Sequence, residues 1–285
     1  MKHLLLLVLV LFLNLQFYGQ TIIGYVIDDS NGEPLIYASI GVIETTFGTI
    51  TNEKGNFRLD VINLPPKSIV RISMIGFKAR TFTIDQLISE QDTIPLERGT
   101  YNLPEVFVSP GGKLIKLGTT SFSFKNGFCG WGGNDFGKGW EIGTMIDLGN
   151  SPKRLKSLHI RINKQSFDSS LFRLHIRDLA DSLPRNELLN TNILISITKE
   201  SGWIAIDLSK YNLVFEGEIA LSLEWIKVIG MDMNKLITLK GSNQSYPAVT
   251  FNKKRKEGLT FTRWGTEAKW AYHDKSSPSI YLIVQ

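Results

Sequence analysis

The sequence predicts an all-β protein made of a small β-sandwich followed by a larger one. Apolar and polar residues alternate along many short segments, which is the period of a strand with one buried face. Turn-forming residues separate these segments at intervals of about ten residues, as in sandwich domains. The charge balance also changes along the chain: residues 21–108 hold 7 Lys or Arg and 11 Asp or Glu, whereas residues 109–285 hold 24 and 16. The Pro/Gly stretch at residues 109–112 lies at this change and suits a linker.

Residues 1–20 have the form of a secretory signal peptide. Lys2 and His3 precede the apolar residues 4–13, and the small residue Gly19 offers a cleavage site before Gln20. Ten apolar residues are too few to span a bilayer, which needs roughly 20. No later segment approaches the length of a bilayer span without containing charged residues. We therefore expect an exported protein without a transmembrane span in the mature chain. The single cysteine, Cys129, excludes a disulfide within the chain.

The first domain is predicted to consist of strands joined by tight turns. Ala38, Ile40 and Val42 alternate with Ser39 and Gly41, which gives one buried and one outward face. Residues 52–55 form a turn that ends in glycine. The same alternation continues in the segments 57–61, 70–74, 94–96 and 106–108.

Four phrases in this region carry a family resemblance. They are GYVIDDSNGEPLIYASIGV, GTITNEKGNFRL, ISMIGFKARTF and YNLPEVFV, in this order along residues 24–108. This region resembles the carboxypeptidase-regulatory-like domain, a transthyretin-like seven-stranded sandwich, in the version found ahead of the plug of TonB-dependent outer-membrane receptors. The resemblance implies an accessory domain without catalytic residues, located in the periplasm or at the outer-membrane surface of a Gram-negative bacterium. The remaining 177 residues cannot supply a plug and a receptor barrel, so a transporter is excluded.

The remainder divides into a linker at residues 109–118 and a jelly-roll-like β-sandwich at residues 119–285. Alternating strands are predicted around residues 158–162, 172–176, 204–208 and 218–225, with a short helix at residues 183–189 that Pro184 would start. The pattern resembles the jelly rolls that bind galactose and other sugars. It contains no diagnostic motif for them.

No sequence motif indicates an enzyme. The patterns G-x-S-x-G, H-E-x-x-H and C-x-x-C are all absent, so we predict no catalytic residue, no metal ligand and no cofactor. A hydrolase whose active site is assembled only by the fold stays open as a third hypothesis. Such a site would require a pocket that holds two carboxylates.

One candidate ligand site combines aromatic rings with a glycine-rich segment at residues 127–139. Rings held on such a backbone can stack on a sugar, and neighbouring polar side chains can bind its hydroxyls or calcium. The alternative is that the rings cover the end of the sandwich. The candidate residues are Trp131, Asn134, Asp135, Trp140, Trp264 and Trp270.

A second candidate is a basic sheet face. If the strands at 158–162 and 172–176 are neighbours, their outward side chains form one cluster: His159, Arg161, Arg173, His175 and Arg177. An exported protein rarely meets nucleic acid, so an acidic glycan, a lipopolysaccharide phosphate or an acidic protein is the expected partner. The acidic first domain is a candidate for this partner within the chain. A solvated or self-neutralised face is the alternative.

The sequence therefore predicts an exported, non-enzymatic accessory protein of a Gram-negative envelope that binds a glycan or an envelope protein through its second domain. The alternative function is a structural or assembly component that acts by protein–protein contacts.

Overall fold

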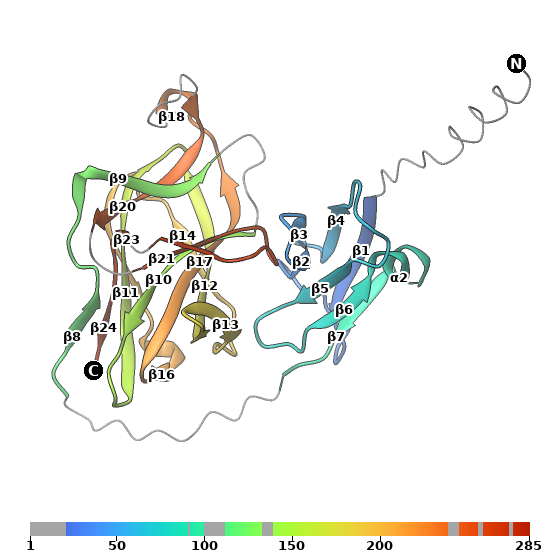
Figure 1. Ribbon diagram of the computed structural model, residues 1–285, viewed down its shortest axis with the longest axis horizontal. Coiled ribbons are helices and arrows are strands. Elements are labelled where there is room, and N and C mark those ends of the chain that lie inside the picture. The colour runs from blue at the N-terminus through green and yellow to red at the C-terminus, as the bar shows by residue number, and fades with distance from the viewer. Residues whose placement is uncertain are drawn as a thin grey trace, which may run out of the picture.

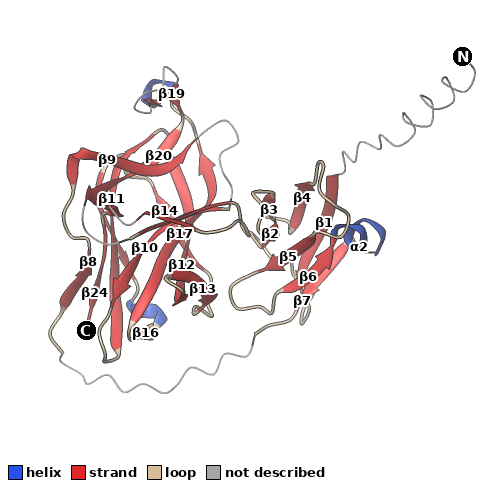
Figure 2. Cartoon of the chain, in the orientation of Figure 1, coloured by secondary structure: helices blue, strands red, loops and turns tan. Residues whose placement is uncertain are grey.

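The computed structural model consists almost wholly of β-strands, arranged as two sandwiches side by side (Figure 1; Figure 2). It describes residues 21–90, 92–99, 112–132, 139–238, 245–255, 259–273 and 276–285. The all-β prediction is confirmed. The signal peptide, the strand predicted at 106–108 and the candidate ligand residues Asn134 and Asp135 lie outside the described residues.

The described part of the first domain contains seven strands in two sheets, the number that the family resemblance implies. They are β1 (Thr21–Asp28), β2 (Ser39–Val42), β3 (Gly48–Ile50), β4 (Asn56–Asp60), β5 (Ile69–Ser73), β6 (Arg80–Thr83) and β7 (Thr93–Leu96). One sheet has the order β4-β1-β7 and the other β3-β2-β5-β6, with β1 and β7 as the parallel pair. Alternate residues of both sheets, among them Val26, Ile40, Leu59 and Ile72, fill the core between them.

A helix, α2 (Ile84–Glu90), was not predicted in this domain. Its start has the chemistry of a capping box, because the backbone N–H of Thr83 donates to Gln86 Oε1 at 2.8 Å. Ile84 and Leu87 are buried in the core of the domain. The helix thus covers one end of the sandwich with a single apolar turn, which is too short to show a helical period in the sequence.

The second domain is a larger sandwich of two sheets. The first sheet contains β10 (Trp140–Asp147), β12 (Ser169–Ala180), β13 (Leu183–Glu187), β14 (Ile193–Ile197), β17 (Glu218–Ile229), β21 (Thr260–Trp264) and β22 (Ala271–His273). The second contains β8 (Ile115–Gly118), β9 (Ser123–Gly132), β11 (Lys153–Gln165), β15 (Gly202–Asp207), β16 (Val214–Phe215), β20 (Ala248–Arg255), β23 (Ser276–Pro278) and β24 (Ile280–Val284). A small hairpin of β18 (Ile237–Thr238) and β19 (Ser245–Tyr246) and two 3-10 turns, η1 (Ser209–Tyr211) and η2 (Met233–Lys235), complete it.

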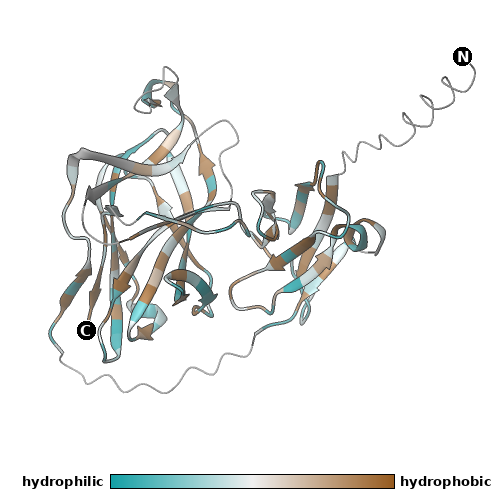
Figure 3. Ribbon diagram, in the orientation of Figure 1, coloured by the Kyte–Doolittle hydropathy of each residue, from teal (hydrophilic) through white to brown (hydrophobic). Residues whose placement is uncertain are grey.

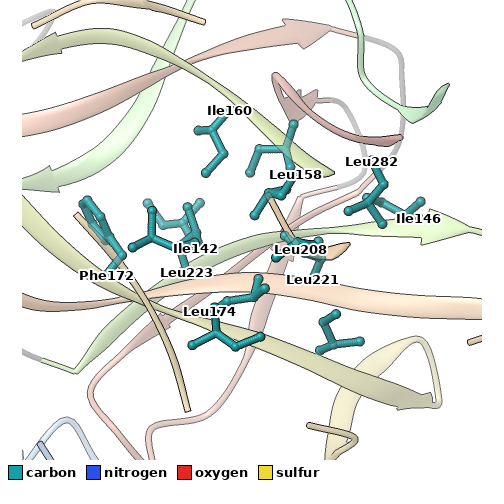
Figure 4. Packing of buried hydrophobic residues seen from close by; sticks show 14 of the residues in the cluster. Ile142, Ile146, Leu158, Ile160, Phe172, Leu174, Leu208, Leu221, Leu223 and Leu282 are labelled. Atoms are coloured by element: carbon teal, nitrogen blue, oxygen red, sulfur yellow. The ribbon is translucent and has the colours of Figure 1, made fainter. Parts of the chain in front are cut away.

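Strand order places β12, β17 and β10 side by side in the middle of the seven-stranded sheet. The eight-stranded sheet is built around the long strand β11, which pairs with β15, β16, β20 and β24. Leu174 and Leu221 from the first sheet belong to one hydrophobic cluster with Leu158 and Leu282 from the second (Figure 4). Hydrophobic residues recur along these strands, which is the alternation seen in the sequence (Figure 3).

Two local predictions in this part of the chain were wrong. Residues 115–118, assigned to the linker, form β8, which pairs with β24, and its half-buried Ile115 and Leu117 pack on the core. The helix predicted at 183–189 is instead strand β13. Asp181 and Ser182 both have positive φ, at 52° and 62°, which is the geometry of a tight hairpin turn. Pro184 is tolerated because β13 lies at the edge of its sheet.

Candidate ligand pocket between the two domains

The first domain docks on the outer face of the seven-stranded sheet. The loop after β21 reaches the first domain at β2 (Figure 1), where Thr266 Oγ1 donates to the carbonyl oxygen of Ile40 at 2.9 Å. The backbone N–H of Glu44 donates to the carbonyl oxygen of Glu267 at 2.9 Å. Ion pairs join Glu53 to Lys227 at 2.5 Å and Glu44 to Lys269 at 3.2 Å. Acidic residues of the first domain thus meet basic residues of the second.

Two glycines make this docking possible. A Cβ at Gly41 would lie 2.3 Å from Thr266 Oγ1, and one at Gly48 would lie 2.6 Å from the same atom. Both glycines come from the sheet edge formed by β2 and β3, so the loop can approach the backbone directly. The outward face of β2 is therefore shaped to receive the second domain.

A cluster of charged side chains is buried beneath the first domain. Arg173 donates to Glu224 at 2.8 Å and to Ser39 Oγ at 3.1 Å, and it also bonds the carbonyl oxygen of Tyr37. The Arg173 side chain is only 1% exposed. One guanidinium of the second domain is therefore held by a carboxylate of its own sheet and by two groups of the first domain.

Glu141 is the centre of the second half of the cluster. Arg177 donates to Glu141 at 2.6 Å, Ser222 Oγ donates to it at 2.7 Å, and Arg263 forms a further ion pair with it. Burial by itself raises the pKa of Glu141, but Arg177 and Arg263 outweigh it and hold that pKa well below its usual range. Glu141 is therefore a fully ionised carboxylate inside the protein.

His175 bridges two carboxylates. Its Nδ1 lies 2.6 Å from Glu187 and its Nε2 lies 3.0 Å from Glu224, so a ring protonated on both nitrogens donates to both. Burial and Arg177 disfavour the charged ring, but Glu141 and Glu187 outweigh them and the pKa of His175 is raised. Burial also opposes ionisation of Glu187 and Glu224, yet His175 and Arg177 lower the pKa of Glu187, and Arg173 and His175 that of Glu224.

The raised pKa of His175 predicts a specific pH dependence of stability. A raised folded pKa means that the stabilisation is complete below the unfolded value of about 6.5 and is lost as the pH rises through the folded value. We expect the free energy of unfolding, measured with urea, to fall over this window and to be flatter in His175→Gln. An equal slope in both proteins would contradict the assignment. The three carboxylates affect stability at acidic pH instead. Their contribution to the free energy of unfolding is lost below about pH 4.5, as the pH falls through their lowered pKa values.

A pocket of about 480 Å³ lies between the domains, next to this cluster. The first domain supplies Ser39, Ser73, Met74 and Phe77, and the second supplies Asn186. The charged lining consists of Arg71, Lys78, Arg173, His175, Arg177, Arg185, Glu187, Arg263 and Glu267. The wall is thus mainly cationic, with a few apolar and hydroxyl groups.

The predicted basic sheet face is not one surface. β11 and β12 lie in different sheets, so His159 and Arg161 are on the opposite face of the domain from Arg173, His175 and Arg177. The three β12 side chains are buried and paired with Glu141, Glu187 and Glu224. The prediction failed because a period of two shows which way a side chain points but not which strand lies beside it.

The tryptophans do not form one exposed site either. Trp131 is buried in the core and donates to the carbonyl oxygen of Trp140, so its ring offers no exposed face for stacking. Trp140 and Trp264 form an edge-to-face pair with centroids 4.9 Å apart, and Trp264 is 41% exposed. Trp270 lies under the guanidinium groups of Arg177 and Arg263, at 5.5 and 4.9 Å from their central carbons. Trp131 is thus a core residue and Trp140 and Trp270 are half-buried, so the four tryptophans are not exposed together.

Part of the acidic half of the cluster was not predicted from the sequence. Glu141, Arg71 and Arg263 were not singled out, and Glu187 was assigned to the surface. Glu224 belongs to the alternative interpretation of a self-neutralised face, in which carboxylates of neighbouring strands pair with the arginines. One signal was present: the segment around Glu224 is an otherwise apolar and small-residue run, IALSLEWI, with both faces buried in the structure. A carboxylate in a strand buried on both faces indicates a buried ion pair.

Among the described residues, no helix has the length and apolar character that crossing a membrane requires. The same residues contain no group of three His, Cys, Asp or Glu side chains placed to hold a metal ion.

Comparisons with known proteins support the family resemblance of the first domain. Two solved structures of the cysteine protease Cwp84, a surface layer associated protein of Clostridium difficile, were matched; one includes its lectin-like domain. They align with TM-scores of 0.37 and 0.33 at 11% identity, over 94% of this chain and 59% and 71% of theirs. The TonB-dependent receptor SusC of Bacteroides thetaiotaomicron is 33% identical over 116 residues, which is 40% of this chain but only 11% of that receptor. Residues 22–108 match the CarboxypepD_reg-like domain, and this part of the chain is therefore a carboxypeptidase-regulatory-like domain.

Proposed function

We propose that this protein is an exported, non-enzymatic accessory protein of a Gram-negative cell envelope that binds an acidic sugar in the pocket between its two domains. The signal-like residues 1–20 and the likeness of the first domain to part of an outer-membrane receptor support the location. The excess of positive charge around the pocket carries the choice of ligand.

This excess is found by pairing the charges in and directly behind the pocket wall. Lys78 is balanced by Glu97 at 2.8 Å, and Arg71 by Glu267 at 2.7 Å. Among the described residues Arg185 has no ion-pair partner. His175 adds a further charge whenever it is protonated. Apart from the Lys78–Glu97 pair, the charged residues in and behind the wall are five arginines and four glutamates, an excess of one positive charge. They are Arg71, Arg173, Arg177, Arg185 and Arg263, and Glu141, Glu187, Glu224 and Glu267.

The rest of the lining fits a sugar ring. A volume of about 480 Å³ lies within the range of small-ligand sites. Phe77 and Met74 offer apolar surface for C–H groups, while Ser73 and Asn186 offer a hydroxyl and an amide partner. A carboxylate or sulfate on the sugar would be bound by arginine in a charge-assisted hydrogen bond.

A hydrolase is less well supported, although two carboxylates, Glu187 and Glu267, line the pocket. Glycoside hydrolysis needs a general acid whose pKa is raised so that it holds a proton at neutral pH. The pKa of Glu187 is lowered instead, because His175 and Arg177 outweigh the effect of burial. The cluster is therefore suited to holding charge in place.

Binding is tested by titration calorimetry of the mature chain with galacturonate, with galactose as its uncharged counterpart. We expect galacturonate to bind and galactose to bind weakly or not at all. Arg185→Gln should weaken galacturonate binding about tenfold or more, the value of one charge-assisted hydrogen bond. Lys54→Gln, in an exposed turn of the first domain away from this pocket, is the control and should change nothing. Equal affinity for both sugars, or no binding of galacturonate, would refute the proposal.

The second candidate, an assembly component of the envelope, is favoured by one observation. Ile229 at the end of β17, Met231, and Met233 at the start of η2 are each exposed, at 57%, 48% and 64%. A contiguous exposed apolar patch would mark a site of protein contact. Photo-cross-linking from position 231 in intact cells tests this function. Cross-links to one envelope protein would support it. Their absence would count against an assembly role and would not affect the sugar-binding proposal.

A further inference from the structure

The outer face of the eight-stranded sheet carries a second group of functional side chains. We name it the cation–aromatic face and define it by Lys116, Phe122, His159, Arg161, Trp203 and Tyr281. It lies on the sheet opposite to the one that the first domain covers. Its residues come from β8, β11, β15, β24 and the segment after β8.

Strand register brings the rings together. His159 lies opposite Tyr281, and Arg161 opposite Trp203. The imidazole of His159 stacks flat on Tyr281, with centroids 4.4 Å apart and planes at 7°. Trp203 meets Tyr281 edge-on at 5.1 Å, and Lys116 Nζ lies 5.4 Å from the centre of the same ring. The strands β15, β11, β24 and β8 stand side by side, so the row extends over three spacings of about 4.8 Å, or about 14 Å.

Arg161 is held in place without a carboxylate partner among the described residues. Its guanidinium lies 3.8 Å above the ring of Phe122. Its Nε is buried and has no hydrogen-bond partner in the described part of the chain. A guanidinium that stacking has already oriented loses little freedom when it binds an anion.

The electrostatic balance of this face is positive. Asp207 is the nearest carboxylate in register, and it is engaged by Ser209, with Lys156 and Lys210 beside it; these contacts lower its pKa. The cations Lys116, Lys156, Arg161 and Lys210 thus face one carboxylate. Burial and Lys116 lower the pKa of His159, whose Nε2 shares a hydrogen bond with Ser157 Oγ at 2.9 Å. The histidine therefore adds a neutral polar ring at neutral pH.

We propose that the cation–aromatic face binds a strand of acidic polysaccharide. The acidic groups of the strand pair with Arg161 and Lys116, while Trp203 and His159 contact the C–H faces of the sugars. The length of the row requires several sugar units, unlike the pocket between the domains. Because the two sites lie on opposite faces of the second domain, this inference does not depend on the function proposed for the pocket.

The test is affinity electrophoresis of the mature chain in gels that contain polygalacturonate, a sulfated polysaccharide or neutral dextran. We expect retardation in the two acidic gels only, and a steep loss of it with added salt. The double variant Lys116→Gln/Arg161→Gln should bind about tenfold or more weakly, and Trp203→Ala should also bind more weakly. The matched controls are Lys54→Gln for charge and Tyr272→Ala for an exposed ring, and both should behave like the wild type.

Results that contradict this proposal differ from those that contradict the pocket proposal. Retardation of the wild type by dextran, or by neither acidic polymer, would overturn the proposal. So would a double variant that binds as the wild type does, or loss of polymer binding in Arg185→Gln, since that result would place the polymer in the pocket. The double variant should still bind galacturonate in calorimetry if the pocket proposal holds, and its melting temperature shows that it is folded.

Discussion

Replacing Glu141 by alanine is expected to lower the free energy of unfolding by about 3–5 kcal/mol, the usual cost of leaving a buried ion pair without one partner. Glu141 is fully buried and neutralises both Arg177 and Arg263. Its removal leaves Arg263 without an ion-pair partner among the described residues, and leaves Arg177 with Glu187 alone, at 3.6 Å. Urea unfolding of the mature chain measures the loss.

Glu218→Ala is the matched control for this experiment, because Glu218 is an exposed carboxylate on the neighbouring strand β17. It should change stability by less than about 0.5 kcal/mol. The double variant Glu141→Leu/Arg177→Met should recover part of the loss, since it removes both charges of one pair. A loss below about 1 kcal/mol in Glu141→Ala would mean that water reaches the cluster and screens it.

Gly41→Val is expected to separate the two domains while leaving both folded. Valine suits a strand, but its Cβ would lie 2.3 Å from Thr266 Oγ1 and 2.9 Å from Glu267 Cβ, so the loop after β21 cannot stay in contact. The radius of gyration from small-angle X-ray scattering should rise. Binding of galacturonate should be lost, because the two domains share the walls of the pocket.

The control is Gly32→Asn in the same domain. Gly32 has a φ of +72°, which asparagine tolerates, and nothing lies within 4 Å of an added Cβ. This variant should scatter like the wild type. If Gly41→Val also does so and still binds the sugar, the loop yields to the new side chain and the docking does not depend on the glycine.

The sequence by itself determined much of the fold. Alternation of apolar and polar residues located most strands, because the period of a strand is local to a few residues. Turn chemistry and the phrases along residues 24–108 identified the first domain, because several spaced motifs occur there in the order that the family resemblance requires. The helix at Ile84–Glu90 and strand β13 were missed because each is a single short element whose pattern is ambiguous.

Only the tertiary structure decided the sites. β11 and β12 follow each other in the chain, yet they enter opposite sheets, and this one fact divides the predicted basic face in two. Arg173 meets Ser39 of the first domain, and Arg177 meets Glu141 of a strand that precedes it by 36 residues. The alternation of side chains depends only on residues close in sequence. The neighbours of each strand depend on contacts between residues far apart in sequence, across the whole sandwich. The same holds for Gly41, whose missing side chain has a purpose only where another domain approaches.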